Sequence, residues 1–358
     1  MANREIKIDL VELPSRADIP NKIWLGHLFG GALRVFNGQL VPGCFPLFIV
    51  HGSVHVPRQE RTIEHDILRQ LSSEGRRFGL VHVMDENYDH NLSAYQLPGC
   101  ELVFREYIRP RGGALRLAID FAKSMYFPLH VDTHFRVSPQ GLYRWLQCQR
   151  NGWRFMKHQL LPKIDTNKVR HIPLGYTDRM AVHRDGSAVP IVNRKYRWSF
   201  CGDSSRSGRK EMIEHMSHVG EGFVHEYHDF TSTDLFPMAS LSGKEYWEIL
   251  SQSVYIPCPC GNVNIDTYRL FEALEAGAIP IVPKAQAWQM FNYYRLLLGD
   301  NPIPTFSNWK EARAFVKRTD IGAAAALAEE IHQWYQGYKE RITAEVNQTI
   351  RRVANVID

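Results

Sequence analysis

Short apolar runs, each bounded by turn residues and followed by a helical stretch, recur along the chain and constrain its fold more than any other feature. This alternation is typical of a mostly parallel sheet covered by helices. It occurs on both sides of HRDGSAVPIVNRKYR (183–197), whose glycine, proline and charged residues indicate a linker. Because 358 residues exceed the size at which one hydrophobic core stops growing, the sequence predicts two Rossmann-like α/β domains that face a cleft.

The predicted domains are residues 1–185 and 195–320, and residues 321–358 form a C-terminal helix that packs across both. One helix of the first domain has apolar residues at helical spacing and ends near Gly75, as a crossover helix does. The expected strands are 45–50, 78–84 and 101–106 in the first domain, and 197–202, 223–227, 253–257 and 278–282 in the second.

The composition, with 44% hydrophobic and 23% charged residues, is that of an ordinary globular protein. The formal net charge of +5 comes without a long basic run, so it predicts no nucleic-acid partner. A basic cleft for a diphosphate explains this charge as well as a slightly cationic surface does. The amino-terminal segment holds no apolar stretch of the length that a signal peptide or a membrane span needs, so we expect a cytoplasmic protein. The six cysteines indicate buried thiols, and we expect no metal at Cys258 and Cys260.

The stretch SVYIPCPCGNVNIDTYRLFEALEAGAIPIVPKA (253–285) predicts a strand, a glycine-containing loop, a helix and a second strand. We expect Asp266 to cap a helix that starts at Thr267, and Gly277 to end this helix with a left-handed turn.

Arg269 and Glu272 stand three residues apart near the amino end of this helix and share one of its faces. Free backbone N–H groups and an arginine are suited to a diphosphate, and a carboxylate one turn further on can accept hydrogen bonds from ribose hydroxyls. The same spacing also fits a surface ion pair.

A second stretch, RWSFCGDSSRSGRKEM (197–212), predicts a strand that ends at Gly202, a loop of small residues, and Arg206 and Arg209 near the start of a helix. Serine and glycine let the backbone approach phosphate oxygens closely, and arginine offers fork-shaped donors to them. A solvated basic turn has the same pattern.

Pro259, Gly261, Asp266, Arg269 and Glu272 follow one another in the first stretch, and Glu272 opens the segment EALEAGAIPIV. Together with the glycine-ended strand and the arginines of the second stretch, this order resembles the exostosin-like glycosyltransferases over residues 197–306. In the first half, GLVHVMDEN (79–87) and HIPLGY (171–176) are similar to that family's Asp-Glu and Pro-Leu-Gly segments, most of all in its xylosyl-transferring branch. Glu106, in VFREY, stands where the family pattern has asparagine.

The resemblance implies a GT-B fold and an inverting transfer of a sugar from a UDP-sugar to a hydroxyl of a glycan acceptor. Xylose is the favoured sugar, and glucuronic acid and galactose are also used in the family. The family's animal members are usually membrane-anchored, whereas we expect no anchor in this chain. It is therefore more similar to a bacterial or viral relative, and a viral one would act in the host cytoplasm. The donor-binding residues are then Gly202, Arg206, Arg209, Pro259, Gly261, Asp266, Arg269 and Glu272.

Inversion requires a general base, which must come from the N-terminal domain. Asp85 and Glu86 follow a predicted strand, where functional groups collect in parallel sheets, and are the favoured candidates. His51 and His55 are placed on the acceptor side. A helix cap for the two carboxylates and a structural role for the histidines are the alternatives.

No Asp-x-Asp pair stands at a strand end, so we expect no metal ion and no other cofactor, with arginines neutralising the departing diphosphate. Two further readings stay open: a UDP-sugar epimerase or phosphorylase, and a non-catalytic glycan- or nucleotide-binding protein of the same fold. A dehydrogenase is disfavoured, since no G-x-G-x-x-G follows a predicted strand.

Overall fold

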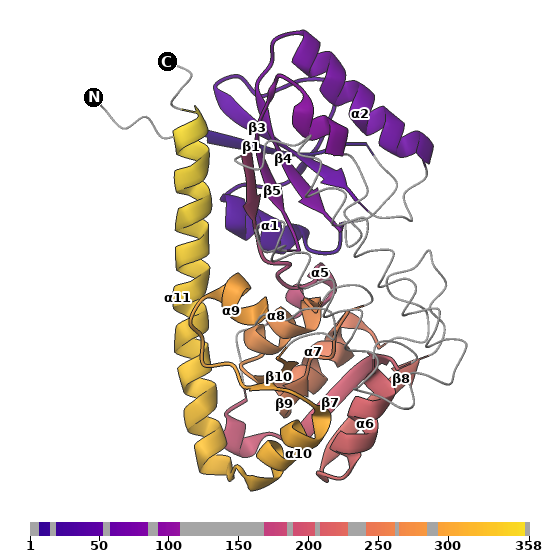
Figure 1. Ribbon diagram of the computed structural model, residues 1–358, viewed down its shortest axis with the longest axis vertical. Coiled ribbons are helices and arrows are strands. Elements are labelled where there is room, and N and C mark those ends of the chain that lie inside the picture. The colour runs from indigo at the N-terminus through magenta and orange to yellow at the C-terminus, as the bar shows by residue number, and fades with distance from the viewer. Residues whose placement is uncertain are drawn as a thin grey trace, which may run out of the picture.

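A computed structural model gives the arrangement of the chain. In the part that it describes, the strands form two sheets, one of six strands and one of five, and all strand pairs are parallel (Figure 1). The expected α/β fold class, with two parallel sheets in two halves, is therefore confirmed. The described residues are 7–14, 19–52, 58–84, 92–107, 168–184, 189–204, 208–227, 241–261, 265–284 and 293–354.

The first sheet has the strand order β2-β1-β3-β4-β5-β6. Its central strands are buried on both faces: Leu47 and Ile49 point into one hydrophobic cluster, whereas Phe48 and Val50 point into another. Helix α1 belongs to the first cluster and helix α2 to the second, so they cover opposite faces. The elements are β1 (Lys7–Glu12), α1 (Lys22–Phe29), β2 (Arg34–Val35), β3 (Cys44–His51), α2 (Arg58–Ser73), β4 (Phe78–Val83), the short 3₁₀ helix η1 (Leu92–Gln96), β5 (Cys100–Arg105) and β6 (Val169–His171).

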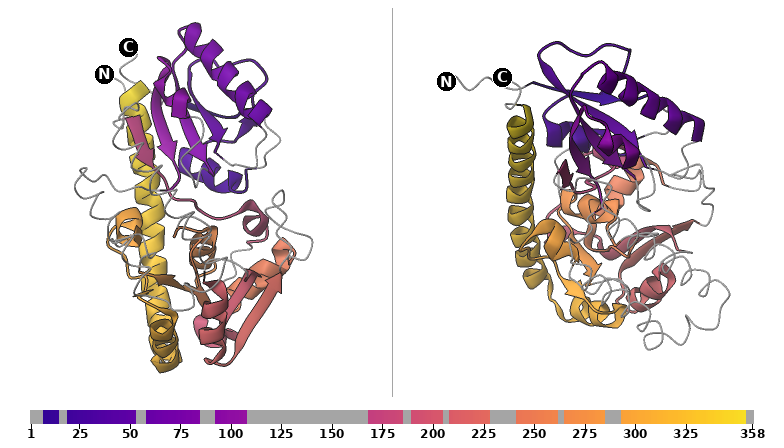
Figure 2. Two further views of the ribbon diagram at one scale, coloured as in Figure 1. Left: turned by 45° about the vertical axis from the view of Figure 1, so that its right-hand side comes forward. Right: turned by 45° about the horizontal axis from the view of Figure 1, so that its top comes forward.

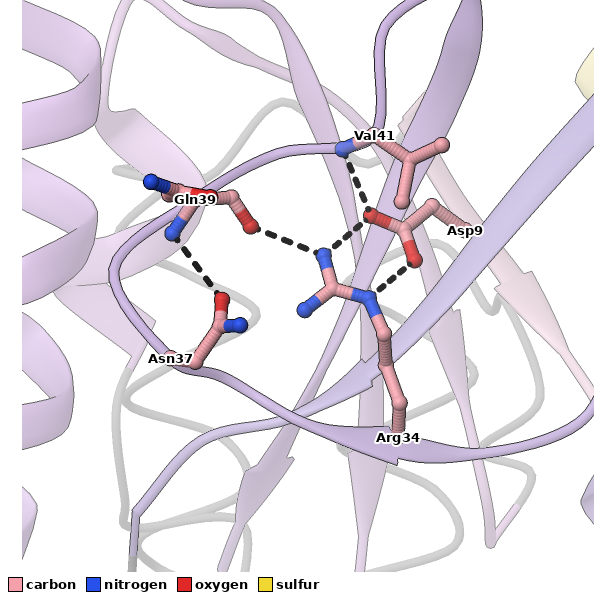
Figure 3. A network of polar contacts seen from close by, with 5 residues as sticks. All are labelled: Asp9, Arg34, Asn37, Gln39 and Val41. Atoms are coloured by element: carbon pink, nitrogen blue, oxygen red, sulfur yellow. Dashed lines mark hydrogen bonds and ion pairs between the residues drawn. The ribbon is translucent and has the colours of Figure 1, made fainter.

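A partly buried ion pair between Arg34 and Asp9 holds the edge strand β2 against β1 (Figure 3). Arg34 donates from Nε to Asp9 Oδ1 at 2.6 Å and from Nη2 to Asp9 Oδ2 at 2.5 Å, and also to the carbonyl of Gln39 at 2.9 Å. The hydrogen bond to Asp9 raises the pKa of Arg34. The bidentate pairing with Arg34 orients the Asp9 carboxylate. This carboxylate also fixes the loop after β2, because it accepts a hydrogen bond from the backbone amide of Val41 at 3.4 Å.

The second sheet has the order β11-β10-β9-β7-β8, which places β7 and β9 side by side at its centre. Helix α7 packs against both of these strands, and helix α8 packs against β10. A capping box, in which Ser242 and Glu245 exchange hydrogen bonds, starts α7. The elements are α5 (Asp178–Ala181), η4 (Ile191–Asn193), β7 (Tyr196–Asp203), α6 (Arg209–Ser217), β8 (Gly222–Tyr227), α7 (Gly243–Ser251), β9 (Ser253–Pro257), α8 (Tyr268–Glu275), β10 (Ile279–Pro283), α9 (Tyr293–Leu298), β11 (Thr305–Phe306) and α10 (Trp309–Arg318).

One arginine fixes the segment that leads into the second sheet. Arg194 donates to the carbonyls of Val189, Ser253 and Ala276 at 2.7–2.8 Å, and burial lowers its pKa to about 10. The end of the predicted linker is thus bound tightly to β9 and to the carboxyl end of α8.

Helix α11 (Ile321–Ala354) runs along both sheets (Figures 1 and 2). It contacts α1 and β5 on one side and β10 and α8 on the other. Its contact with α8 includes Glu275, whose buried carboxylate accepts hydrogen bonds from Tyr335 at 2.9 Å and Lys339 at 3.1 Å and also pairs with Arg184. Within the described ranges, neither this helix nor any other is long and apolar enough to cross a membrane.

The helix boundaries confirm one expectation at α8 and correct another. Gly277 has a φ of 61° and follows the end of α8, as predicted. The prediction that Asp266 caps the helix is wrong, because α8 begins at Tyr268 and the N-cap position is Thr267. Thr267 has an extended backbone and makes no side-chain capping bond, whereas Asp266 is buried one residue earlier.

Candidate functional site

The carboxyl ends of β7 and β9 and the amino end of α8 meet at one edge of the second sheet. Arg269, the second residue of α8, reaches β7, and its Nη2 donates to the carbonyl oxygen of Cys201 at 2.8 Å. Its guanidinium carbon lies 4.7 Å from the centre of the Phe200 ring. This hydrogen bond uses one of the five N–H donors of a guanidinium, and it fixes the orientation of the fork.

Gly202 is the residue that lets Arg269 come this close to β7. A Cβ atom built on Gly202 would lie 2.7 Å from Nη2 of Arg269, so a larger residue would push the guanidinium away. The structure therefore brings together two predicted site residues from two separate stretches of sequence. This close approach explains why a glycine stands at the end of β7.

Arg209 lies at the same end of β7. It is the first residue of α6, and its Nη1 donates to the carbonyl of Asp203 at 2.8 Å. Gly208, at the N-cap position, has a φ of 69°, a left-handed conformation that suits glycine. Both arginines that the structure describes at this predicted site thus bind carbonyls of the same strand end, and Arg206 lies outside the described residues.

Glu272 is buried, with an exposed fraction of 4%, and it binds two hydroxyl groups. Thr177 donates to Oε1 at 2.5 Å, and Tyr246 donates to Oε2 at 2.7 Å. Burial, and then the neighbouring carboxylate, raise the pKa of Tyr246 well above its ordinary value, so its hydroxyl stays protonated as a donor. The alternative of a surface ion pair between Arg269 and Glu272 is therefore wrong.

The loop between β9 and α8 carries the other predicted donor-site residues. Pro259 is buried, Gly261 is partly exposed and Asp266 is buried at 3% exposure. Burial raises the pKa of Cys258 to about 12, so this thiol stays protonated. In the part of the chain that the structure describes, no three His, Cys, Asp or Glu side chains gather closely enough to hold a metal ion.

Of the residues predicted on the acceptor side, His51 ends β3 and is fully buried. Asp85, Glu86 and His55 lie outside the described residues. Met84, the residue directly before Asp85, has a left-handed backbone with a φ of 58°, which is uncommon for a residue with a side chain. The chain thus turns sharply at the point where the predicted base follows β4.

Glu106 holds this turn, a role that the sequence did not reveal. Its Oε2 accepts a hydrogen bond from the backbone N–H of Met84 at 2.8 Å, and its Oε1 accepts one from Nδ2 of Asn21 at 2.9 Å. Asn21 also donates to the carbonyl of Leu174 at 2.7 Å. The carboxylate that stands in place of the family's asparagine therefore joins the end of β4, the start of α1 and the chain after β6.

Glu106→Gln is expected to lower the free energy of unfolding by about 1–3 kcal/mol, because both oxygens accept N–H groups and the new amide turns an NH₂ toward one of these donors. Urea denaturation measures this loss. Glu101→Gln is the matched control, on the strand β5 that Glu106 directly follows: Glu101 pairs with Arg77 and is about one-third exposed (32%), so the expected loss is below about 1 kcal/mol. Equal losses in the two variants would contradict the role of Glu106.

Thr177 and Asp178 connect the first sheet to this site. The carboxylate of Asp178 accepts from the amides of Lys22 and Ile23 at 3.0 and 2.8 Å, and so caps the amino end of α1. Thr177, its neighbour, bonds Glu272 on α8. Neither Thr177 nor Tyr246 was expected from the sequence, since a lone hydroxyl residue carries no local signal for a partner so far along the chain.

Comparison with known proteins gives one family match. Residues 178–354 match the family model described as the RXYLT1 C-terminal domain, a range that extends from α5 to the end of α11. No curated protein matches the chain in sequence. Among solved structures, HepE from Anabaena, solved with UDP and glucose, is 8% identical with a TM-score of 0.45, covering 98% of this chain and 100% of that one. An α1,3-fucosyltransferase is 11% identical with a TM-score of 0.40, covering 95% and 92%.

The family match covers the whole second sheet and every described residue predicted to bind the donor. The exostosin-like assignment made from the sequence stays a prediction. The C-terminal half of the chain thus matches the RXYLT1 C-terminal domain, in agreement with the glycosyltransferase class that the sequence predicts.

Proposed function

We propose that the protein is a glycosyltransferase that binds a UDP-sugar at the edge of the second sheet and transfers the sugar to a hydroxyl of a glycan acceptor. The observation that carries this proposal is Arg269, which is oriented by Cys201 and Phe200 where the ends of β7 and β9 meet the start of α8. Ligands of open parallel sheets bind at this edge. The match to the RXYLT1 C-terminal domain supports the same class of function.

The chemistry of the donor explains why arginines are needed here. A UDP-sugar releases UDP, and negative charge grows on the diphosphate oxygens of UDP as the bond to the sugar breaks. Fixed donors aimed at this charge are worth on the order of 3 kcal/mol each in the transition state. Arg269, Arg209 and the amino end of α8 are proposed to supply such donors, with Arg206 as a further candidate, and the proposal includes no metal ion.

The transfer is proposed to invert the anomeric configuration, with xylose as the favoured sugar. A base then takes the proton of the acceptor hydroxyl while its oxygen attacks the anomeric carbon from the face opposite the diphosphate. Asp85 and Glu86 are the candidates, because they follow Met84 at the carboxyl edge of the first sheet. His51 and His55 are proposed to lie toward the acceptor.

A thermal-shift and hydrolysis screen tests the donor site. The ligands are UDP, GDP, CMP and a panel of UDP-sugars, each with and without EDTA. We expect UDP and one UDP-sugar to raise the melting temperature by the same amount in the presence and absence of EDTA. A protein that responds to none of the nucleotides would rule out the transferase, and an effect of EDTA would rule out metal independence.

Single variants of the candidate bases separate catalysis from binding. Asp85→Asn and Glu86→Gln are expected to keep UDP affinity, and the variant that lacks the base is expected to lose about 100-fold or more in transfer rate. If the wild-type protein binds the donor and transfers nothing to any acceptor, the non-catalytic binding protein is the better description. Release of an epimerised UDP-sugar without an acceptor would point to the epimerase.

A further inference from the structure

We infer that Thr177 and Tyr246 position the carboxylate of Glu272 for the hydroxyls of a ribose, so that nucleoside recognition depends on a hydroxyl from outside the second sheet. This inference rests on the proposed function, because it assigns two positioning residues to the donor site. The observation behind it is the pair of hydrogen bonds on Glu272, from Thr177 to Oε1 at 2.5 Å and from Tyr246 to Oε2 at 2.7 Å.

Two donors on different oxygens fix the plane of the carboxylate. The last torsion of a glutamate is broad when nothing holds it. Thr177 and Tyr246 each hold one oxygen, so the group is restrained before a ligand arrives. An ionised carboxylate has about four acceptor positions, which leaves room for ribose hydroxyls beside the two bonds present. A group that is oriented in advance loses less entropy on binding.

Each donor is itself held in place. Tyr246 lies on α7, whose start is fixed by the capping box and whose body packs on β7 and β9. Thr177 lies directly before α5, and its neighbour Asp178 accepts hydrogen bonds from the first two amides of α1. The position of Thr177 is therefore set by the helix that covers the first sheet.

The two glutamates of α8, Glu272 and Glu275, have different hydrogen-bond partners. The carboxylate on the next turn, Glu275, binds Arg184 and Lys339 in addition to the hydroxyl of Tyr335. Cations that bind a carboxylate occupy its lone pairs with strong bonds. The two glutamates of one helix therefore differ: Glu275 is bound by two cations as a structural group, whereas the hydrogen bonds to Glu272 come from the hydroxyls of Thr177 and Tyr246.

The test compares UDP with 2′,3′-dideoxy-UDP by isothermal titration calorimetry. The wild-type protein is expected to bind UDP about 10- to 100-fold more tightly, as the loss of hydrogen bonds to a charged group predicts. In Tyr246→Phe and in Thr177→Val this ratio is expected to fall several-fold toward one, because the carboxylate is no longer held against the ribose. Thr177→Ser keeps the hydroxyl and is expected to keep the wild-type ratio.

Tyr335→Phe is the matched control, since it removes the same kind of hydroxyl from a glutamate of the same helix and is expected to leave the ratio unchanged. Equal weakening of both ligands by Tyr246→Phe and Thr177→Val would overturn the inference while leaving the donor site intact. Failure of the wild-type protein to bind UDP would instead overturn the proposed function itself. Circular dichroism checks that each variant folds. If Tyr246→Phe does not fold, the comparison of Thr177→Val with Thr177→Ser still tests the inference.

Discussion

Replacing Arg269 with alanine is expected to weaken UDP binding by about 100-fold, because removing one partner of a buried charge pair costs about 2–5 kcal/mol. The loss in transfer rate is expected to be about 100- to 1000-fold, the effect of one fixed donor on a developing negative charge. The physical reason is that the Cys201 carbonyl and the Phe200 ring hold the planar guanidinium of Arg269 at the end of β7. Isothermal titration calorimetry with UDP measures the first effect.

Two further variants show whether charge or geometry is responsible. Arg269→Lys keeps the charge but not the planar fork, so an intermediate affinity is expected. Arg69→Ala removes an arginine that is 63% exposed on α2, and the affinity for UDP is expected to stay at the wild-type value. The assignment of Arg269 fails if its alanine variant, folded by circular dichroism, binds UDP as tightly as the wild-type protein does.

Gly175→Ala is expected to destabilise the protein by about 2–5 kcal/mol, the sum of about 1–2 kcal/mol for a left-handed backbone and about 1–3 kcal/mol for overpacking. Gly175 has a φ of 68°, and a Cβ atom there would lie 2.1 Å from the indole of Trp24. Trp24 has no exposed surface and stacks on Phe271 of α8 with ring centres 6.4 Å apart. The clash therefore lies where Trp24 of α1 packs against Phe271 of α8.

Gly30→Ala separates the two contributions. Gly30 has nearly the same backbone, with a φ of 69°, but a Cβ atom there meets nothing within 4 Å. Its alanine variant is expected to lose only the backbone part, about 1–2 kcal/mol. Urea denaturation followed by tryptophan fluorescence measures both variants, and an equal loss in the two would show that Trp24 has room to move.

Most of the strands that the sequence predicted have continuous apolar runs. Strands β3 and β9 are buried on both faces, so nearly every residue must be apolar and the run is visible without knowledge of the partners. Strand β1 was missed, because Lys7, Asp9 and Glu12 interrupt its apolar residues. The buried Asp9 is tolerated only because Arg34, 25 residues further on, binds both of its oxygens.

The candidate donor-site residues could be proposed from the sequence because their spacing carries a physical meaning within one short segment. Arg269 stands near the start of a helix and Gly202 at the end of a strand, and both positions can be inferred from local patterns. The direct approach of Arg269 to Gly202 was not predicted, since it requires that β7 and β9 lie next to each other. That adjacency is a property of the sheet order.

The sequence by itself determined the two α/β halves, most of their strands and the positions of the candidate diphosphate-binding residues, because burial and helix periodicity act over a few neighbouring residues. The tertiary structure alone decided what each buried polar group binds. Glu272 fits a surface ion pair in the sequence, yet its partners are Tyr246, 26 residues away, and Thr177, 95 residues away. A buried carboxylate must be satisfied by whatever donors the fold brings to it, and that choice is made only when distant elements pack together.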